Sequence, residues 1–169
     1  KALFKNLIGI ELTAGCTSGC SDCYLMIPHG VTSRVSFSSF EEVIKRYHDE
    51  LPEYVDFHYG NEPFDWNEGD KGLVDIYKTY KKYRPQAEVN FITYFPKGSE
   101  DQMSQVISEM IKHVPEGEEI KENIRISLRQ KSPDLRHKEL LGLREHTDVV
   151  KKKVKEIEER IRQDIQKQT

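Results

Sequence analysis

The sequence predicts an α/β fold, a partial (βα) barrel built on a parallel sheet, and two observations support this expectation. Strand-like apolar runs alternate with segments whose apolar residues recur at helical spacing, in the order β-α-β-α-β-α-β-α. Such alternation implies parallel strands joined by crossover helices. The chain supplies about four such units, too few for a closed eightfold barrel. We therefore expect either an open, partial barrel or a doubly wound sheet.

The strands are expected where β-branched and aromatic residues gather between turn formers. They are residues 6–13, 54–59, 88–95 and 123–129. Parallel strands that are covered on both faces are usually apolar throughout, whereas these alternate apolar and polar residues. We therefore expect one face to pack under the helices and the other to line a polar ligand cavity, although an antiparallel sheet with one wet side gives the same pattern. The polar face would carry Glu11, Asp56, His58, Asn90, Arg125, Ser127 and Arg129.

The helices are expected from stripes of apolar residues. Ser38 opens a capping box with Glu41, and apolar residues follow at helical spacing as far as Tyr47. Further stripes lie at residues 73–80 and 103–111, and residues 146–167 form a long C-terminal helix. Tyr77, Tyr80 and Tyr83 are expected to pack in the core or at its rim, and Trp66 is expected to anchor a loop.

Length and charge narrow the functional classes. We expect one domain over residues 1–169, because the chain is long enough for a real core. The net charge of −3 gives no positive field for nucleic acid or an anionic membrane surface. A transmembrane run and a signal peptide are both absent from this sequence, so we expect a cytoplasmic protein. Because the chain starts at Lys1 rather than Met, we also expect residues upstream.

The three cysteines of the chain, Cys16, Cys20 and Cys23, all fall within eight residues. An odd number excludes a complete disulfide framework, and such clustering indicates metal. Thiolates suit iron–sulfur clusters, zinc and copper. One possibility is a structural Cys3His zinc site, with His29 or His48 as the fourth ligand. The other is a [4Fe–4S] cluster, in which three cysteines leave one iron open for a ligand.

Two motifs resemble the radical S-adenosylmethionine (radical SAM) superfamily. The run CTSGCSDCY matches the CxxxCxxC motif of that family, and it follows the first strand, as is usual there. Nearly forty residues later, the second strand ends at Gly60-Asn61-Glu62-Pro63, which is similar to the family's GGEP motif. Asn61 replaces the second glycine, and we expect it to keep the turn because Asn tolerates unusual backbone angles. The family core has six βα units, so this chain would be a truncated form.

The resemblance implies a site and a reaction. Cys16, Cys20 and Cys23 would ligate three irons, and SAM would chelate the fourth. Reductive cleavage of SAM would then lead to hydrogen abstraction from substrate. Gly60, Asn61, Glu62 and Pro63 would hold the methionyl amino group of SAM. Ser127 and Arg129 would contact its ribose or carboxylate. Asp22 stands where the family usually has an aromatic residue near the adenine, and Tyr24 follows the third cysteine instead.

The favoured function is therefore an oxidoreductase-type radical SAM enzyme that acts on a peptide or a small metabolite. An electron donor such as flavodoxin or ferredoxin would supply the reducing electron. The compact size also fits an activating enzyme that makes a glycyl radical on a partner protein. From another class, a non-catalytic cysteine-rich module that binds zinc or an iron–sulfur cluster would explain the cysteines, but it has no need of Gly60–Pro63.

Overall fold

Short parallel strands lie at the centre of the structure. The computed structural model describes residues 6–20, 25–57, 60–94, 98–114 and 124–126, together with residues 4, 23 and 96. The chain divides into two compact units, residues 1–19 with 23–127 and residues 20–22 with 128–169. Apart from Cys20, the described residues all belong to the first unit. The helix expected at 146–167 lies outside the described residues.

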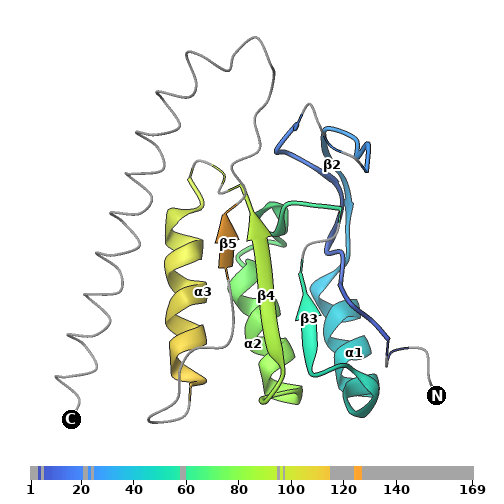
Figure 1. The fold of residues 1–169 in the computed structure, drawn as a ribbon, viewed down its shortest axis with the longest axis vertical. Helices are drawn as coiled ribbons and strands as arrows, with labels where there is room; N and C mark the ends of the chain where they lie inside the picture. Colours follow the sequence, from blue (N-terminus) through green and yellow to red (C-terminus); the bar gives the residue numbers. More distant parts are fainter. Residues whose placement is uncertain are drawn as a thin grey trace, which may run out of the picture. The chain divides into compact units, whose positions relative to one another are not determined.

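The parallel sheet has the strand order β3-β4-β5. Strand β3 is Tyr54–Asp56, β4 is Glu88–Thr93 and β5 is Ile124–Ile126 (Figure 1). Both neighbouring pairs are parallel, and the register places Val55 opposite Val89. These three strands correspond to three of the expected ones, so the sequence placed the centre of the sheet correctly.

A further segment runs parallel to β3 along its other edge. The amide of Asp56 donates to the carbonyl of Ile8 at 3.1 Å, and the amide of Ile10 donates to the carbonyl of Asp56 at 2.9 Å. The strand expected at residues 6–13 is therefore reduced to one parallel bridge, between Gly9 and Asp56. Ile8 is 64% exposed, so its side chain does not pack in the core.

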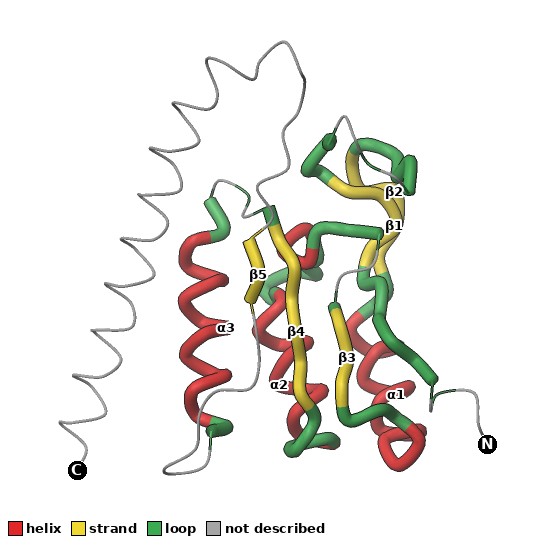
Figure 2. Tube along the Cα trace, viewed as in Figure 1, coloured by secondary structure: helices red, strands yellow, loops and turns green. Residues whose placement is uncertain are grey.

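Helices connect each strand to the next. They are α1 at Phe37–Tyr47, α2 at Leu73–Tyr83 and α3 at Glu100–Lys112. Helix α1 packs on α2, and α2 packs on α3, so the three lie side by side along the sheet (Figures 1 and 2). This confirms a mixed α/β fold with parallel strands and crossover helices. The strands of the described residues do not close into a barrel.

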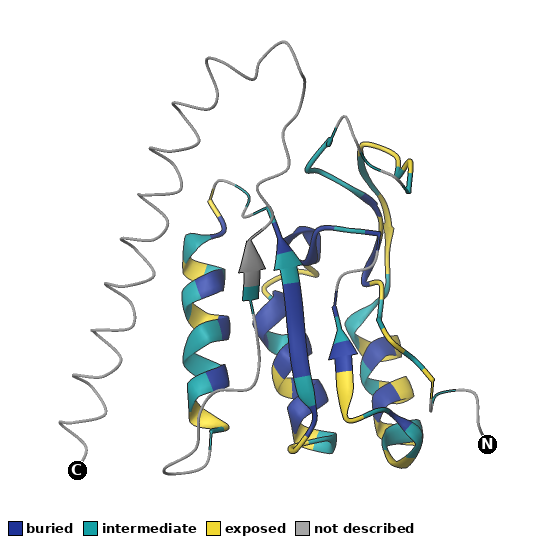
Figure 3. Ribbon diagram, in the orientation of Figure 1, coloured by how far each residue is buried: buried dark blue, intermediate teal, exposed yellow. Residues whose placement is uncertain are grey.

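The core forms around Phe57, which follows β3 and is fully buried. Its ring stacks on Phe91 with centroids 5.8 Å apart and meets the edge of Tyr80 at 5.5 Å. Phe40 of α1 lies 6.1 Å away. In Figure 3, most of β4 is coloured as buried, and the helices carry buried segments as well. The predicted packing role of Tyr80 is confirmed, and an aromatic cluster of this kind is stabilising beyond the area that it buries.

An antiparallel hairpin precedes the first helix and was not expected. Strand β1, Thr13–Cys16, pairs with β2, Gly30–Arg34. The pairing shifts between Ala14 and Gly15, which marks a bulge. The cysteine run is thus the connection of a hairpin and not a simple strand-to-helix loop. Residues 30–34 were missed because a run of five residues, mostly small or polar and exposed, carries a weak strand signal.

The cap of α1 also differs from expectation. Ser36 occupies the N-cap, and its hydroxyl accepts from the amide of Ser39 at 3.1 Å. The predicted box of Ser38 and Glu41 would have started the helix two residues later. Three nearby serines compete for the cap, and Ser36 has the extended backbone that the position requires.

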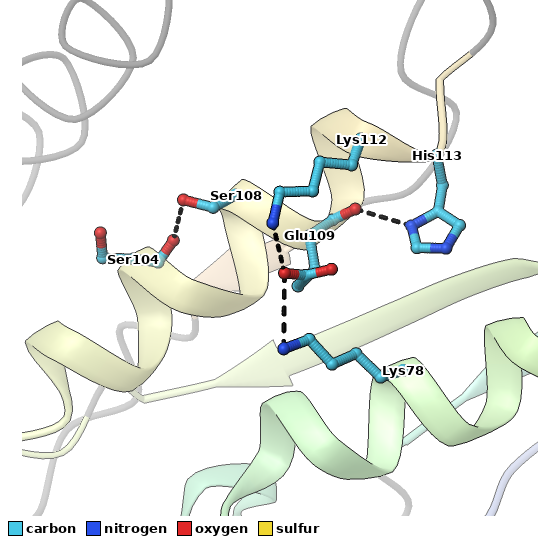
Figure 4. A network of polar contacts seen from close by, with 6 residues as sticks. All are labelled: Lys78, Ser104, Ser108, Glu109, Lys112 and His113. Atoms are coloured by element: carbon cyan, nitrogen blue, oxygen red, sulfur yellow. Dashed lines mark hydrogen bonds and ion pairs between the residues drawn. The ribbon is translucent and has the colours of Figure 1, made fainter. Parts of the chain in front are cut away.

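Outside the sheet, Trp66 and an ion pair hold the elements together. Trp66 is fully buried, as expected of a packing anchor, and its indole nitrogen donates to the carbonyl of Val35 at 2.9 Å. Between α2 and α3, Glu109 lies 3.5 Å from the ammonium of Lys78 and 2.7 Å from that of Lys112 (Figure 4). Partial burial raises the pKa of Glu109, but these two lysines outweigh it and hold that pKa below its usual value.

No helix of the described residues is long and apolar enough to cross a membrane.

The hairpin gives a first prediction, a stability difference between two glycine substitutions. Gly15 and Gly30 have φ of +87° and +88°, so alanine is strained at both, at a cost of about 1 kcal/mol. At Gly15 a new Cβ would also lie 2.0 Å from the carbonyl oxygen of Gly30, whereas nothing lies within 4 Å at Gly30. We expect Gly15→Ala to lower the free energy of unfolding by about 3 kcal/mol in urea titrations. Equal losses for Gly30→Ala and Gly15→Ala would contradict the clash with the Gly30 carbonyl as the cause.

Candidate functional site

The expected functional motifs lie at the carboxyl ends of strands, β1 of the hairpin and β3 of the parallel sheet. The cysteine run starts at the end of β1, the Gly60–Pro63 segment follows β3, and Thr93 ends β4. Loops at this edge of a parallel sheet are the usual place for ligands. A short 3₁₀ helix, η2 at Pro63–Asp65, completes the edge.

All three cysteines are half-buried and lie outside any disulfide. Cys16 ends β1, and its amide donates to the carbonyl of Pro28 at 3.1 Å. Its sulfur lies 2.7 Å from the hydroxyl of Ser18. The carbonyl of Cys23 accepts from the amide of Met26 at 3.0 Å, which closes a turn. Burial raises the pKa of the Cys16 thiol, which favours its protonated form in the metal-free protein. Metal binding at Cys16 would therefore release a proton.

The donor chemistry fits a thiolate-bound metal or cluster. The thiols are soft ligands, none is in a disulfide, and three leave a fourth position open. Within the described ranges, however, the side chains of His, Cys, Asp and Glu nowhere gather in a group of three or more that could hold a metal ion. The cysteine run would therefore have to rearrange around a metal.

The two histidines considered as a fourth ligand are placed differently. His48 follows the end of α1, where its ring lies 2.9 Å from the carbonyl of Lys45. Because α1 runs against the strands, this end lies at the opposite edge from the cysteine run. His29 is exposed, as expected, and forms a bridge with Cys16. A Cβ on Gly19 would lie 2.6 Å from the His29 ring, so of these two histidines only His29 borders the run.

Gly60 is buried in a tight space beside the cysteine run. A Cβ at this position would lie 2.8 Å from Oε1 of Glu11 and 3.0 Å from Cδ1 of Ile27. Ile27 belongs to the same connection as the cysteines. A side chain at position 60 would therefore displace the ends of these two side chains, and the backbone of Gly60 lies close to the connection that carries the cysteines.

Asn61 ties this segment to β1. In the amide orientation that satisfies its neighbours, its oxygen accepts from the amides of Leu12 at 3.2 Å and Thr13 at 3.3 Å. Among the described residues other than glycine, Met26 alone has a positive φ. Asn61 is thus not in the left-handed region, and the expectation that it is tolerated for an unusual backbone angle is wrong. The side-chain amide of Asn61, for which glycine has no equivalent, makes the connection to β1.

Glu62 is a buried carboxyl group, only 2% exposed. Its Oε1 accepts from the hydroxyl of Thr93 at 2.5 Å and from the amide of Phe64 at 3.2 Å, and its Oε2 accepts from the amide of Tyr94 at 2.9 Å. Burial raises its pKa to about 7, although these bonds lower it. Both oxygens are therefore engaged within the protein. Glu62 joins the segment after β3 to the end of β4.

Asp65 belongs to the same edge, and the sequence pattern did not identify it. It is 9% exposed, and it accepts from the amide of Thr17 at 2.8 Å and from the Thr17 hydroxyl at 2.5 Å. The Thr17 hydroxyl also lies 3.2 Å from that of Tyr94. The signal was present in the run EPFD, where two acids flank a proline and an aromatic residue, but a short turn has no periodicity to mark it.

The remaining predicted residues fall partly within the described residues and partly outside them. Of the expected polar face, Glu11 is exposed, Asp56 is half-buried, and Asn90 is 1% exposed, its amide donating to Glu88. A face that buries Asn90 is not an open cavity at that point. The following lie outside the described side chains: Tyr24, His58, Arg125, Ser127 and Arg129.

No protein-family model, curated protein or solved structure matches this chain.

The buried Glu62 gives a second prediction, a pH dependence of stability. Its pKa is 4.5 when unperturbed and about 7 in the folded protein, so the folded state binds more protons between these values. The contribution to stability is complete below the unfolded pKa and is lost as the pH rises through the folded pKa, by about 3 kcal/mol in total. We expect Glu62→Gln to flatten this fall in urea titrations between about pH 4 and 8, a range that covers the interval from the unfolded to the folded pKa.

The exposed Glu42→Gln on α1 is the matched control, and it should keep the wild-type slope. An unchanged slope in Glu62→Gln would show that Glu62 is ionised in the folded protein throughout this range.

Proposed function

We propose that this chain is a radical SAM enzyme that binds a [4Fe–4S] cluster and abstracts hydrogen from a peptide or small-metabolite substrate. One observation supports this most strongly. The connection that carries the cysteines and the stretch from Gly60 to Asp65, far apart in sequence, lie against each other, since Gly60 approaches Ile27 and Asp65 binds Thr17. A metal module without a second ligand has no need of this juxtaposition.

In this proposal Cys16, Cys20 and Cys23 hold three irons, and the fourth iron is left for SAM. When reduced, such a cluster supplies one electron for cleavage of the SAM sulfonium and so for hydrogen abstraction. The backbone at Gly60 would face the methionyl group, because that glycine has no side chain between the backbone and the connection that carries Ile27. Tyr24, Ser127 and Arg129 are the remaining proposed SAM contacts.

Glu62 has a supporting role in this arrangement. The family resemblance assigns the acid of this motif to the methionyl amino group, but both oxygens of Glu62 accept bonds from its own chain. We propose that Glu62 holds the backbone of the motif in place and that backbone carbonyls bind the ammonium. Below the motif, Phe64 and Trp66 are buried and keep water from its underside.

The strand order supports a partial barrel over a doubly wound sheet. Residues 8–10, β3, β4 and β5 are neighbours in the order of the chain. A doubly wound sheet reverses its order at a switch point, and no reversal occurs among the described strands. We also propose a cytoplasmic location and a flavodoxin or ferredoxin as electron donor, since free thiols persist in reducing compartments.

A zinc module is the second candidate, and the position of His29 favours it. His29 borders the cysteine run at Gly19 and pairs with Cys16. In a Cys3His site it would be the fourth ligand. A glycyl-radical activating enzyme would share the cluster and differ only in its substrate.

Anaerobic reconstitution with iron and sulfide gives the third prediction. We expect about four irons per chain and dithionite-dependent formation of 5′-deoxyadenosine and methionine from SAM. Cys16→Ser, Cys20→Ser and Cys23→Ser should each lose most of the iron and reduce SAM cleavage by about 100-fold or more. Iron analysis and chromatography of the nucleoside products measure both.

His29→Ala separates the two candidates, with His48→Ala as the matched control. If the cysteines bind a cluster with an open iron, the iron content is unchanged in both variants. If they form a Cys3His zinc site, the affinity for zinc falls in His29→Ala and is unchanged in His48→Ala. Stoichiometric zinc in the wild type without SAM cleavage would overturn the proposed function.

A further inference from the structure

Four residues close a ring of side-chain and backbone contacts at the edge of the sheet. Asp65 accepts both bonds from Thr17, Thr17 meets Tyr94, and the amide of Tyr94 donates to Glu62. Glu62 and Asp65 are joined through η2, where the amide of Asp65 donates to the carbonyl of Glu62 at 3.0 Å. The ring thus links the cysteine run, the segment after β3 and the end of β4.

The contact between Asp65 and Thr17 is the strongest link to the cysteine run. It consists of two bonds, at 2.8 Å from the amide and 2.5 Å from the hydroxyl, to a carboxylate that is 9% exposed. Because the Thr17 hydroxyl has one proton and gives it to Asp65, the Tyr94 hydroxyl must donate to Thr17. Each donor in this contact therefore has an acceptor, and the orientation of Thr17 is defined.

Thr17 directly follows Cys16 in the chain, so the bonds to Asp65 hold the backbone beside the first cysteine. The peptide nitrogen bound by Asp65 belongs to the bond between these two residues. Cys16 is also fixed on its other side, where its amide donates to Pro28. The start of the run is therefore held from both directions, while the thiols are outside any disulfide and can take a metal.

We infer that Asp65 and Thr17 are positioning residues for the metal-binding run. They hold the peptide after Cys16 against η2, which places the first thiol beside Gly60–Pro63. This inference rests on the proposed function and gives a role to Asp65, which lies outside both motifs, and to Thr17, which lies between the first two cysteines. A run whose start is fixed in advance loses less conformational freedom on binding metal, and its first cysteine keeps its position relative to the SAM segment.

Three variants test the two bonds separately. Asp65→Asn keeps the shape but turns an amide group toward at least one donor of Thr17. Thr17→Val removes the hydroxyl and keeps the amide, while Thr17→Ser keeps both. Thr32→Val is the matched control, because the Thr32 hydroxyl donates to Ala14 of the same hairpin at 3.1 Å and does not touch the run. Asp70→Asn controls for the loss of a negative charge at an exposed site.

Two measurements are made on the full chain. The first is hydrogen exchange of the peptide that contains the Thr17 amide, in the metal-free protein. The second is iron uptake at stoichiometric iron and sulfide, followed by KM and kcat for SAM. We expect faster hydrogen exchange in Asp65→Asn. Iron binding should be about tenfold weaker in Asp65→Asn and in Thr17→Val. The KM for SAM should be raised in the fraction of each of these variants that still binds the cluster. Thr17→Ser and both controls should match the wild type.

If Asp65 and Thr17 only stabilise the fold, the variants contain fewer folded molecules, but the fraction that binds the cluster keeps the wild-type KM for SAM. The inference is overturned if Asp65→Asn shows wild-type exchange and wild-type iron uptake, or if Thr17→Ser is as defective as Thr17→Val. If the wild type takes up no iron, the proposed function fails. The exchange rates of Asp65→Asn and its control then still decide whether Asp65 holds the run.

Discussion

The burial of two carboxyl groups three residues apart is the constraint on which the candidate site depends. Glu62 and Asp65 sit at either end of one 3₁₀ turn, and each is satisfied by donors from another part of the chain. A buried carboxylate without partners is costly, so the fold must bring Thr93, Tyr94 and Thr17 to it. The turn after β3 thereby fixes the positions of both neighbouring segments.

This arrangement has an energetic cost that a purely structural turn would avoid. Burial lifts the pKa of Glu62 to about 7, so ionisation near neutral pH opposes folding. Apolar residues in the same place would pack without that cost. Polar bonds, however, have direction. They determine which side of the turn faces the cysteine run. A ligand site formed between loops requires each loop to have one such orientation.

The cysteine run combines a fixed start with available ligands. The backbone of Cys16 is held by pairing with β2, while its thiol lies against the hydroxyl of Ser18, a neighbour within the same run. Binding of a metal would displace the thiol proton and draw the later cysteines toward it. The hairpin thus holds the start of the run. The connection between β1 and β2 would change conformation when the cysteines bind a metal.

The sequence by itself determined the α/β class, the places of β3, β4 and β5, the three helices and the two motifs. Periodicity and spacing are local, so they can be read directly from residues such as Val55, Phe57 and Cys16. Only the tertiary structure showed that residues 13–16 turn into a hairpin, that Ser36 caps α1, and that Glu62 faces inward. It alone joined Asp65 to Thr17, 48 positions away. The physical reason is that the partner of a buried polar group is set by packing between distant segments, which leaves no periodic trace in the sequence.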